Sequence, residues 1–494
     1  MIMKKITIVI LLVSVAIAGI TSSSRAQMAS REDAHKVANN WIRLIIDKTG
    51  DWGGSQTGEV ERIQEFKRGD RVLGYFCRVN PGGHIVLSLR KELAPVKAYS
   101  TTCILDPEAD ADLVDVIKIG MERILNGIEI KLGPLESVRT EDLVKILEID
   151  YRSSWRDLER GDFGKINYQQ GDTLLTSHWH QNEPYNAQCP DHGCTMACGS
   201  NTNAVVGCVA TAGAQVMRYW AWPPFGVGSP YDNSYDWVNM PDVFTGCTWS
   251  QVQVDAVAEL CHEVGTAAGM DYGCAGSEAC FASCAGPDLL DAFEDKFRYS
   301  GEADNRNRGD YDQDGWWSII VNQLNENRPL PYRVLEHVFV CDGWQIVGSQ
   351  RQYHMNYGWG WVGTCQDGCD TWYNLDELYY PSGGNLDDEK LITRLYPGPA
   401  LGPFFYGDYS PGSFPYLYFD RDATSTGATF HSGYLQFLPG VKVTCTSTAG
   451  DLIEFLGTTA YNCVLYTRGD PSKGIRIYND GHIYLYQNGS IKFH

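Results

Sequence analysis

Residues 207–223 read GCVATAGAQVMRYWAWP, an apolar segment that starts after a glycine and stops at Pro223-Pro224. Apolar and small side chains at positions 209, 212, 213, 216, 217 and 220 recur at the spacing of one helix face. Proline cannot continue a helix, so the two prolines mark its end. The segment is predicted to form a buried helix that begins at Cys208.

The position of Cys208 suits a reactive thiol. The first N–H groups of a helix are unpaired and carry the positive end of the helix dipole, which lowers the pKa of a thiol from its usual ~8.5. The alternative is a small buried residue or half of a disulfide, the commoner role of a cysteine in a cysteine-rich exported chain. Cys208 is a candidate nucleophile only if a base accompanies it.

His337 is the candidate base, because it lies about 130 residues beyond Cys208, near the separation of the two groups in papain-like cysteine proteases. It opens the apolar run 338–341, which is predicted to be a buried strand that ends in a turn at Asp342-Gly343. A histidine at the mouth of such a strand can contact a thiolate and protonate the leaving amine.

Two further side chains complete a candidate site. Asn356, on a predicted strand at 352–357, is expected to hold the ring of His337 in one tautomer, although it also suits a turn before Gly358. His354 is a rival base, which we interpret as a packed histidine. Gln181 is a candidate donor that, with the backbone N–H of Cys208, stabilises an oxyanion.

Length and charge limit the class of protein. A chain of 494 residues exceeds the roughly 250–300 residues of a single core, so two or three domains are expected. The net charge of −21 opposes binding to phosphate backbones, so nucleic acid is not an expected partner.

The first 26 residues have the pattern of an export signal, with Lys4 and Lys5, an apolar run at 6–20 and a small-x-small site at Ser24-Arg25-Ala26. A membrane anchor is the alternative, but the apolar run is shorter than the ~20 residues that span a bilayer. The protein is therefore expected outside the cell or on its surface.

Sixteen cysteines suit an oxidising compartment. Cys194/Cys198, Cys280/Cys284 and Cys365/Cys369 share a spacing that also occurs in zinc sites. We favour disulfides, and we expect no metal and no cofactor. Their pairing cannot be deduced from spacing.

The domain pattern is α+β. A helix at 31–50, a hairpin at 72–79 and 84–89, and a helix at 110–125 form an N-terminal unit. A charge-rich linker follows, and we place a maturation boundary near its end, with an uncut interdomain connection as the alternative. The expected units are a signal peptide (1–26), an N-terminal unit with linker (27–165), a main domain (166–397) and an all-β module (400–494), in which Cys445 and Cys463 pair strands.

Taken together, several motifs resemble the streptopain family of secreted, papain-like cysteine peptidases. They are, in chain order, 181–186 with Cys189-Pro190, 207–212, 215–217 with Pro223, 270–273, 337–340 with Asp342-Gly343, and 353–356 with 358–360. The resemblance covers about residues 30–397. It implies a papain-like fold, an inhibitory propeptide, autocatalytic maturation, a Cys–His pair and an oxyanion glutamine at Gln181.

Two positions depart from the family pattern. Glu336 replaces the glycine that usually precedes the histidine, and Tyr357 replaces the first tryptophan of Asn-Trp-Gly-Trp. Trp359, Glu336 and Ser283 are candidate residues that support the site or bind substrate.

The expected function is that of a secreted cysteine endopeptidase made as a zymogen, which acts on protein or peptide substrates and is inhibited by its own propeptide. The alternative is a degenerate papain-fold protein for binding or adhesion, with a C-terminal module that binds a surface or a polymer.

Overall fold

The structure is a computed structural model that describes residues 27–109, 112–147, 149–223, 225–335, 337–358, 370–374 and 389–397, together with the backbone of strands between 404 and 493. The expected signal peptide at 1–26, Glu336, Trp359 and the Cys365/Cys369 pair lie outside the described residues. So do the side chains of Cys445 and Cys463.

The N-terminal unit contains the predicted helix and hairpin. Helix α1 (Arg31–Thr49) starts at a capping box between Ser30 and Asp33 and ends at Gly50, whose φ of 100° favours glycine. Strands β2 (Arg71–Asn80) and β3 (His84–Ser88) form the expected antiparallel hairpin. Helix α2 (Asp112–Leu132) extends beyond the predicted end at 125. Strands β1 (Glu59–Arg68) and β4 (Val96–Ser100) complete the unit.

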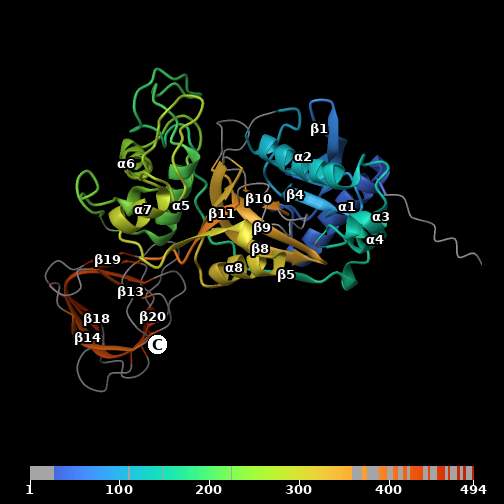
Figure 1. Ribbon diagram of the computed structural model, residues 1–494. Helices are drawn as coiled ribbons and strands as arrows, with labels where there is room; N and C mark the ends of the chain where they lie inside the picture. The colour runs from blue at the N-terminus through green and yellow to red at the C-terminus, as the bar shows by residue number, and fades with distance from the viewer. Residues whose placement is uncertain are drawn as a thin grey trace, which may run out of the picture.

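One sheet runs through both the N-terminal unit and the main domain (Figure 1). The order of its strands is β1-β2-β3-β4-β10-β9-β8-β7-β11-β6, and β5 also pairs with β8. The strands after the N-terminal unit are β5 (Tyr168–Gln170), β6 (Asp304–Asn307), β7 (Leu330–Val334), β8 (His337–Val347), β9 (Gln350–Asn356), β10 (Asp370–Tyr373) and β11 (Lys390–Thr393). The N-terminal unit therefore docks by adding strand β4 to the edge of β10.

Helices cover both faces of this sheet. One core joins α2 and α8 (Gln313–Asn325) to β7, β8 and β9. On the other face, α1 packs on the N-terminal strands, and α5 (Cys208–Trp220) packs on β8. Alternate residues of β8 serve the two cores, since Val338 and Val340 face α5 while Phe339 and Cys341 join the core of α2 and α8.

The helices α5, α6 (Gln251–Ala267) and α7 (Leu289–Asp291) form a lobe beside the sheet, which gives an α+β fold (Figure 1). Helix α5 begins at Cys208 as predicted. It ends at Trp220, before the prolines, because Ala221 adopts the left-handed conformation with φ 46°.

The predicted turn at Asp342-Gly343 is wrong. Strand β8 continues to Val347, and the register shifts by a bulge between Cys341 and Gly343. A Cβ on Gly343 would lie 3.0 Å from the Cβ of His354, so the glycine allows close approach of the two strands. The chain reverses at Gly348 and Ser349 instead.

The segment between α2 and β5 is partly folded. It contains α3 (Thr140–Val144), α4 (Arg152–Arg160) and a short 3-10 turn (Phe163–Lys165). Trp155 and Leu158 of α4 are buried against α1, whereas most of the stretch 161–170 is exposed. Of the predicted linker, therefore, residues 161–170 at its end have the exposure that a protease needs.

The C-terminal strands are β12 (Phe404–Tyr409), β13 (Tyr416–Phe419), β14 (Ala423–Phe437), β15 (Val443–Cys445), β16 (Ile453–Tyr461), β17 (Leu465–Thr467), β18 (Ile475–Tyr478), β19 (His482–Tyr484) and β20 (Lys492–Phe493). They match the expected all-β composition, and their pairings are parallel. Paired residues such as Ala423 and Val443 lie roughly 20 residues apart, a spacing typical of solenoid coils.

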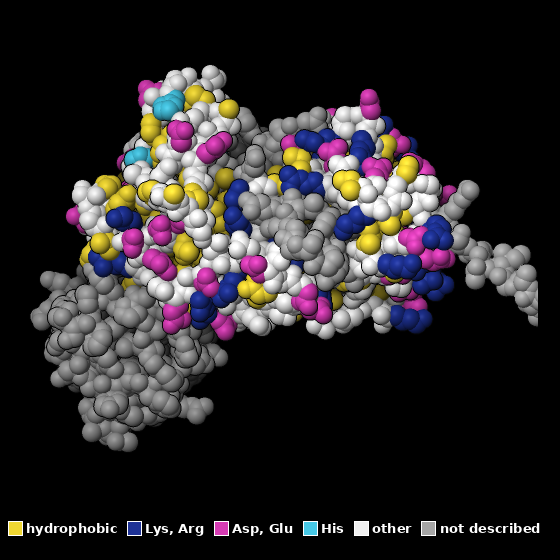
Figure 2. Space-filling model, in the orientation of Figure 1, with side chains coloured by type: hydrophobic (Ala, Val, Ile, Leu, Met, Phe, Trp, Pro, Cys, Tyr) yellow, Lys and Arg dark blue, Asp and Glu magenta, His cyan; other side chains and the backbone are white. Residues whose placement is uncertain are grey.

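Charged side chains of both signs are mixed over the visible face of the N-terminal unit and main domain (Figure 2). Among the described helices, none combines the length and the apolar character needed to cross a bilayer.

Candidate active site

Gly207 fixes the start of the helix that carries Cys208. Its φ of 88° is a conformation that favours glycine. A Cβ there would lie 2.8 Å from the carbonyl oxygen of Ser277 and 2.9 Å from the methyl group of Met270. Because no larger side chain fits, the loop at 270–277 can pack directly against the residue before Cys208.

The thiol of Cys208 is free and sits among backbone donors. The N–H groups of Val338, Val209 and Cys208 itself act to lower its pKa. Burial acts in the opposite direction and is the larger effect, so the pKa of Cys208 is raised. The expectation of a thiolate stabilised by the helix start is therefore wrong for this precursor form, because desolvation outweighs the helix.

The ring of His337 lies against a backbone carbonyl. Its Nε2 lies 2.9 Å from the carbonyl oxygen of Tyr357. A carbonyl can only accept, so Nε2 carries the hydrogen and Nδ1 keeps a lone pair. Burial lowers the pKa of His337 to about 4, against the smaller opposing effect of the Tyr357 carbonyl. At neutral pH neither Cys208 nor His337 is charged.

Asn356 does not hold His337 in the predicted way. Its side-chain amide donates to the carbonyl oxygen of Ser177 at 2.7 Å, and its Oδ1 accepts from the N–H of Gly358 at 3.2 Å. The acceptor beside the His337 ring is the backbone of the next residue, Tyr357. Asn356 therefore shapes the chain around Tyr357 and Gly358, and the backbone carbonyl orients the ring.

Gln215 lies two turns after Cys208 on the buried face of α5 and faces Asn356. Its Oε1 accepts from the backbone N–H of Trp179 at 3.0 Å and from the hydroxyl of Ser177 at 3.2 Å. Oε1 of Gln215 also accepts from Nδ2 of Asn356, and Nε2 of Gln215 donates to Oδ1 of Asn356. One side chain thus connects the helix of Cys208, the strand of Asn356 and the segment before Gln181.

Gln181 lies beside the start of α5. Its carbonyl oxygen accepts from the N–H of Val206 at 2.9 Å, two residues before Cys208. Its side chain is half-buried. The structure thus places the backbone of the predicted oxyanion residue next to the segment that leads to the thiol.

Ser283 lies between the two cysteines of the Cys280–Cys284 disulfide. It is exposed in the loop closed by Cys280–Cys284, has φ 63°, and its hydroxyl lies 3.4 Å from the Asn305 amide. The other two predicted supporting residues lie outside the described residues.

Disulfides brace the loops around the start of α5. Cys194 pairs with Cys274, Cys198 with Cys247, and Cys280 with Cys284. The prediction of disulfides is confirmed for these six cysteines. Zinc binds cysteine as a thiolate, and a sulfur in a disulfide is not a thiolate.

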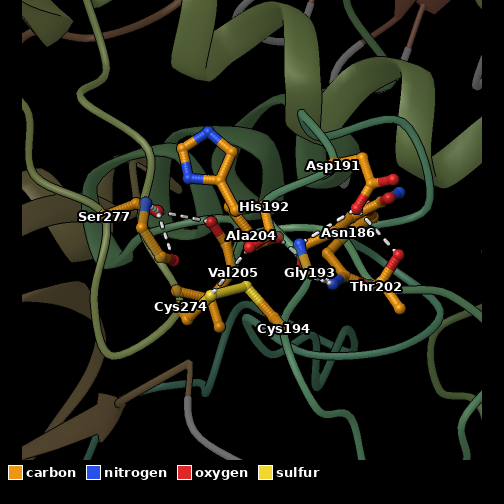
Figure 3. The surroundings of a disulfide bond; sticks show 12 residues. Asn186, Asp191, His192, Gly193, Cys194, Thr202, Ala204, Val205, Cys274 and Ser277 are labelled. Atoms are coloured by element: carbon orange, nitrogen blue, oxygen red, sulfur yellow. Dashed lines mark hydrogen bonds between the residues drawn. A yellow bond between two sulfur atoms is a disulfide. The ribbon is translucent and has the colours of Figure 1, made fainter.

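Figure 3 shows the Cys194–Cys274 bond among the loops that approach Val205. The hydroxyl of Ser277 donates to the carbonyl oxygen of Val205 at 2.6 Å, and the N–H of Val205 donates to Gly273 at 3.1 Å. The disulfide therefore anchors a loop that supports the residues just before Cys208.

Two His–Asp pairs involve strands of the sheet: His354 of β9 pairs with Asp342 of β8, and His178, in the segment before α5, pairs with Asp370 of β10. Nδ1 of His354 is 2.6 Å from Asp342, and Nδ1 of His178 is 3.0 Å from Asp370. Burial alone would lower the pKa of His354, but Asp342 outweighs burial and raises it to about 9. His354 is therefore a charged partner of Asp342, consistent with its interpretation as a packed histidine.

Three elements of the site escaped prediction, namely the carbonyl of Tyr357, the carboxylate of Asp342 and the amide of Gln215. Only Gln215 carried a signal in the sequence, because an amide on the apolar face of a buried helix needs hydrogen-bond partners.

Part of the chain is similar in sequence to known peptidases. Residues 179–368 match the Peptidase C10 family. Streptopain of Streptococcus pyogenes serotype M1 is 26% identical over 361 residues, which cover 66% of this chain and 80% of streptopain. The thiol protease/hemagglutinin PrtT of Porphyromonas gingivalis is 28% identical over 206 residues, 37% of this chain and 22% of PrtT.

Two solved structures are also similar. A fragment of prointerpain A from Prevotella intermedia has a TM-score of 0.49 at 23% identity and covers 68% of this chain and 99% of the fragment. Active interpain A has a TM-score of 0.35 at 26% identity, with 46% of this chain and 95% of interpain A covered.

A free thiol at the start of α5 and a histidine on the neighbouring strand β8 are the two groups that a cysteine peptidase requires. The family match and the similarity to streptopain support the streptopain family, and the chain is a cysteine peptidase made as a zymogen. Its substrates are peptides, and its propeptide is inhibitory.

Proposed function

We propose that Cys208 is the nucleophile and His337 the general base and acid of this peptidase. The hydrogen bond from Nε2 to the carbonyl of Tyr357 carries the proposal, because it leaves Nδ1 with the lone pair that a base requires. The backbone N–H of Val338, the residue after His337, acts to lower the pKa of the Cys208 thiol, which supports their proximity.

The reaction then has two steps. Nδ1 of His337 takes the thiol proton while sulfur bonds to the peptide carbonyl carbon, and the C–N bond breaks as the amine leaves with that proton. Water, deprotonated by His337, hydrolyses the thioester and releases the acid and the thiol. The Gln181 side chain and the N–H of Cys208 stabilise the oxyanion, with Asn356 fixing the backbone that orients His337.

We also propose the organisation of the precursor. Residues 1–26 direct export and are removed, 27–165 form the propeptide, 166–397 the peptidase domain and 400–494 a separate module. Support for the boundary comes from the exposed stretch 161–170. The enzyme acts as an endopeptidase outside the cell or at its surface, and Glu336, Trp359 and Ser283 influence substrate binding.

The C-terminal module is proposed to bind a surface or polymer. The parallel strand pairings from β12 to β20 support this role, because stacked coils create an extended face. Full-length protein should pellet with the producing cells, whereas a chain ending at residue 397 should stay in the supernatant. If both chains pelleted to the same extent, the C-terminal module would not bind the cell surface.

The catalytic proposal is tested by Cys208→Ala in the full chain, with Cys189→Ala as control, since Cys189 is a free but buried cysteine of the same domain. Cys208→Ala should abolish both precursor processing and hydrolysis of a fluorogenic peptide. Cys189→Ala should retain both. Normal processing and hydrolysis by the Cys208→Ala chain would rule the mechanism out.

A further inference from the structure

Three fully buried glutamines line the junction between the propeptide strands and the peptidase strands. Gln345 lies on β8, and Gln350 and Gln352 lie on β9. A buried amide needs hydrogen-bond partners for both its donor and its acceptor groups. Here several of these partners belong to the propeptide.

Gln350 and Gln352 hydrogen-bond the backbone N–H and carbonyl groups of Val96, the first residue of β4. The N–H of Val96 donates to Oε1 of Gln350 at 3.1 Å, and its carbonyl accepts from Nε2 of Gln352 at 3.2 Å. At this end of β4, side chains of the peptidase therefore replace the backbone partners of a neighbouring strand.

Gln345 contacts a propeptide side chain. Its Nε2 donates to the hydroxyl of Tyr99 at 2.9 Å and to Oε1 of Gln352 at 2.8 Å. The ring of Tyr99 packs between Trp41 and Trp52 in the propeptide core, with centroid distances of 5.4 and 5.9 Å. Tyr99 is thus rigidly held in the propeptide while its hydroxyl reaches the peptidase.

The rest of β4 docks through its backbone. Ala98 and Tyr99 pair with Tyr373 and Trp372 of β10, and the N–H of Asn374 donates to the carbonyl of Lys97 at 2.9 Å. Backbone pairing at a sheet edge supplies affinity but little selectivity, because any extended chain offers the same groups. The glutamine contacts add the selectivity.

We propose that Gln345, Gln350 and Gln352, with the edge of β10, form a strand-recognition surface of the peptidase that selects β4 of its own propeptide through Tyr99. This deepens the zymogen assignment by naming the recognition residues. An amide-lined surface suits a partner that must later leave, because water can satisfy the exposed amides, whereas an apolar patch of the same size would promote aggregation.

Amide hydrogen exchange tests the surface without needing activity. In the full-length Cys208→Ala chain, Tyr99→Phe removes the hydroxyl that Gln345 contacts, and Gln352→Met removes the donor to Val96. Tyr75→Phe is the matched control, because the Tyr75 hydroxyl bonds Ala29 within the propeptide at 3.0 Å. Tyr99→Phe and Gln352→Met should each speed exchange at β4 about fivefold, the loss expected for one hydrogen bond, and Tyr75→Phe should not.

Processing gives a second readout in chains that retain Cys208. Tyr99→Phe should convert to the mature form about fivefold faster than Tyr75→Phe. Unchanged exchange at β4 in both Tyr99→Phe and Gln352→Met, or equal acceleration in Tyr75→Phe, would overturn the recognition surface. If the chain with Cys208→Ala as its single substitution were still processed to the mature form, the catalytic proposal would fail. The hydrogen-exchange result at β4 would not be affected.

Discussion

The side-chain amides of Gln215 and Asn356 face each other across the junction of α5 and β9. Nε2 of Gln215 lies 3.0 Å from Oδ1 of Asn356, and Nδ2 of Asn356 lies 3.1 Å from Oε1 of Gln215. Both residues are buried. This reciprocal pair fixes the helix that carries Cys208 relative to the strand that leads to Tyr357.

Gln215→Leu should therefore reduce catalysis more than substrate binding. Small displacements of a catalytic group have large effects on rate, so we expect kcat to fall about 100-fold with little change in KM. Steady-state kinetics of the mature enzyme measure both. Gln188→Leu, an exposed glutamine of the same domain, should leave kcat unchanged. A Gln215→Leu enzyme with normal kcat would show that the pair has no positioning role.

The precursor should react slowly with alkylating agents at neutral pH. Burial raises the pKa of Cys208 and lowers that of His337 to about 4, so the thiol is neutral and no imidazolium stabilises its thiolate. The alkylation rate of freshly purified precursor should rise with pH and still be rising above pH ~8.5. The measurement is iodoacetamide labelling of Cys208 by mass spectrometry. Rapid labelling at pH 6 would contradict a neutral pair.

The His354–Asp342 pair should make stability depend on pH. Asp342 raises the pKa of His354 to about 9, above the ordinary value of 6.5. This contribution is fully present below pH 6.5 and is lost as the pH rises through about 9. Urea unfolding of Cys208→Ala protein should show a loss on the order of 2 kcal/mol between pH 6.5 and 9.5.

His354→Gln should flatten this slope, because the remaining amide does not titrate. Asp370 and His178 also lie in this region, so His178→Gln serves as the comparison. A slope that survives in His354→Gln would assign the effect to another group.

The Cys194–Cys274 disulfide should stabilise the peptidase more than Cys280–Cys284. The two bonds span 80 and 4 residues respectively. In the chain-entropy description their contributions are about 4–5 and about 2 kcal/mol. The Cys194→Ser/Cys274→Ser chain should therefore melt at a lower temperature than the Cys280→Ser/Cys284→Ser chain. Equal melting temperatures would show that the longer loop is held by its hydrogen bonds.

Local features of the fold could be predicted from the sequence, and pairings across the chain could not. The start of α5 at Cys208 follows from a glycine and a helical repeat, and the β2–β3 hairpin follows from Asn80-Pro81-Gly82-Gly83. The pairing of β4 with β10 has no local signature, because backbone groups of any extended segment can pair.

The site shows the same division. The residue types at 208, 337 and 181 predict their chemistry, whereas the carbonyl that accepts from the His337 ring belongs to the backbone, which no residue type reveals. Likewise, desolvation of the partly buried Cys208 outweighs the backbone N–H groups that lower the pKa of its thiol, and only the folded chain shows that balance.

The most direct test of the central claim is to inactivate the mature enzyme with a peptidyl, thiol-directed inhibitor and locate the adduct by peptide mass spectrometry. One label per molecule on Cys208, formed in step with complete loss of peptidase activity, is the predicted result. Full activity after complete labelling of Cys208, or inactivation with the label on another residue, would contradict the account.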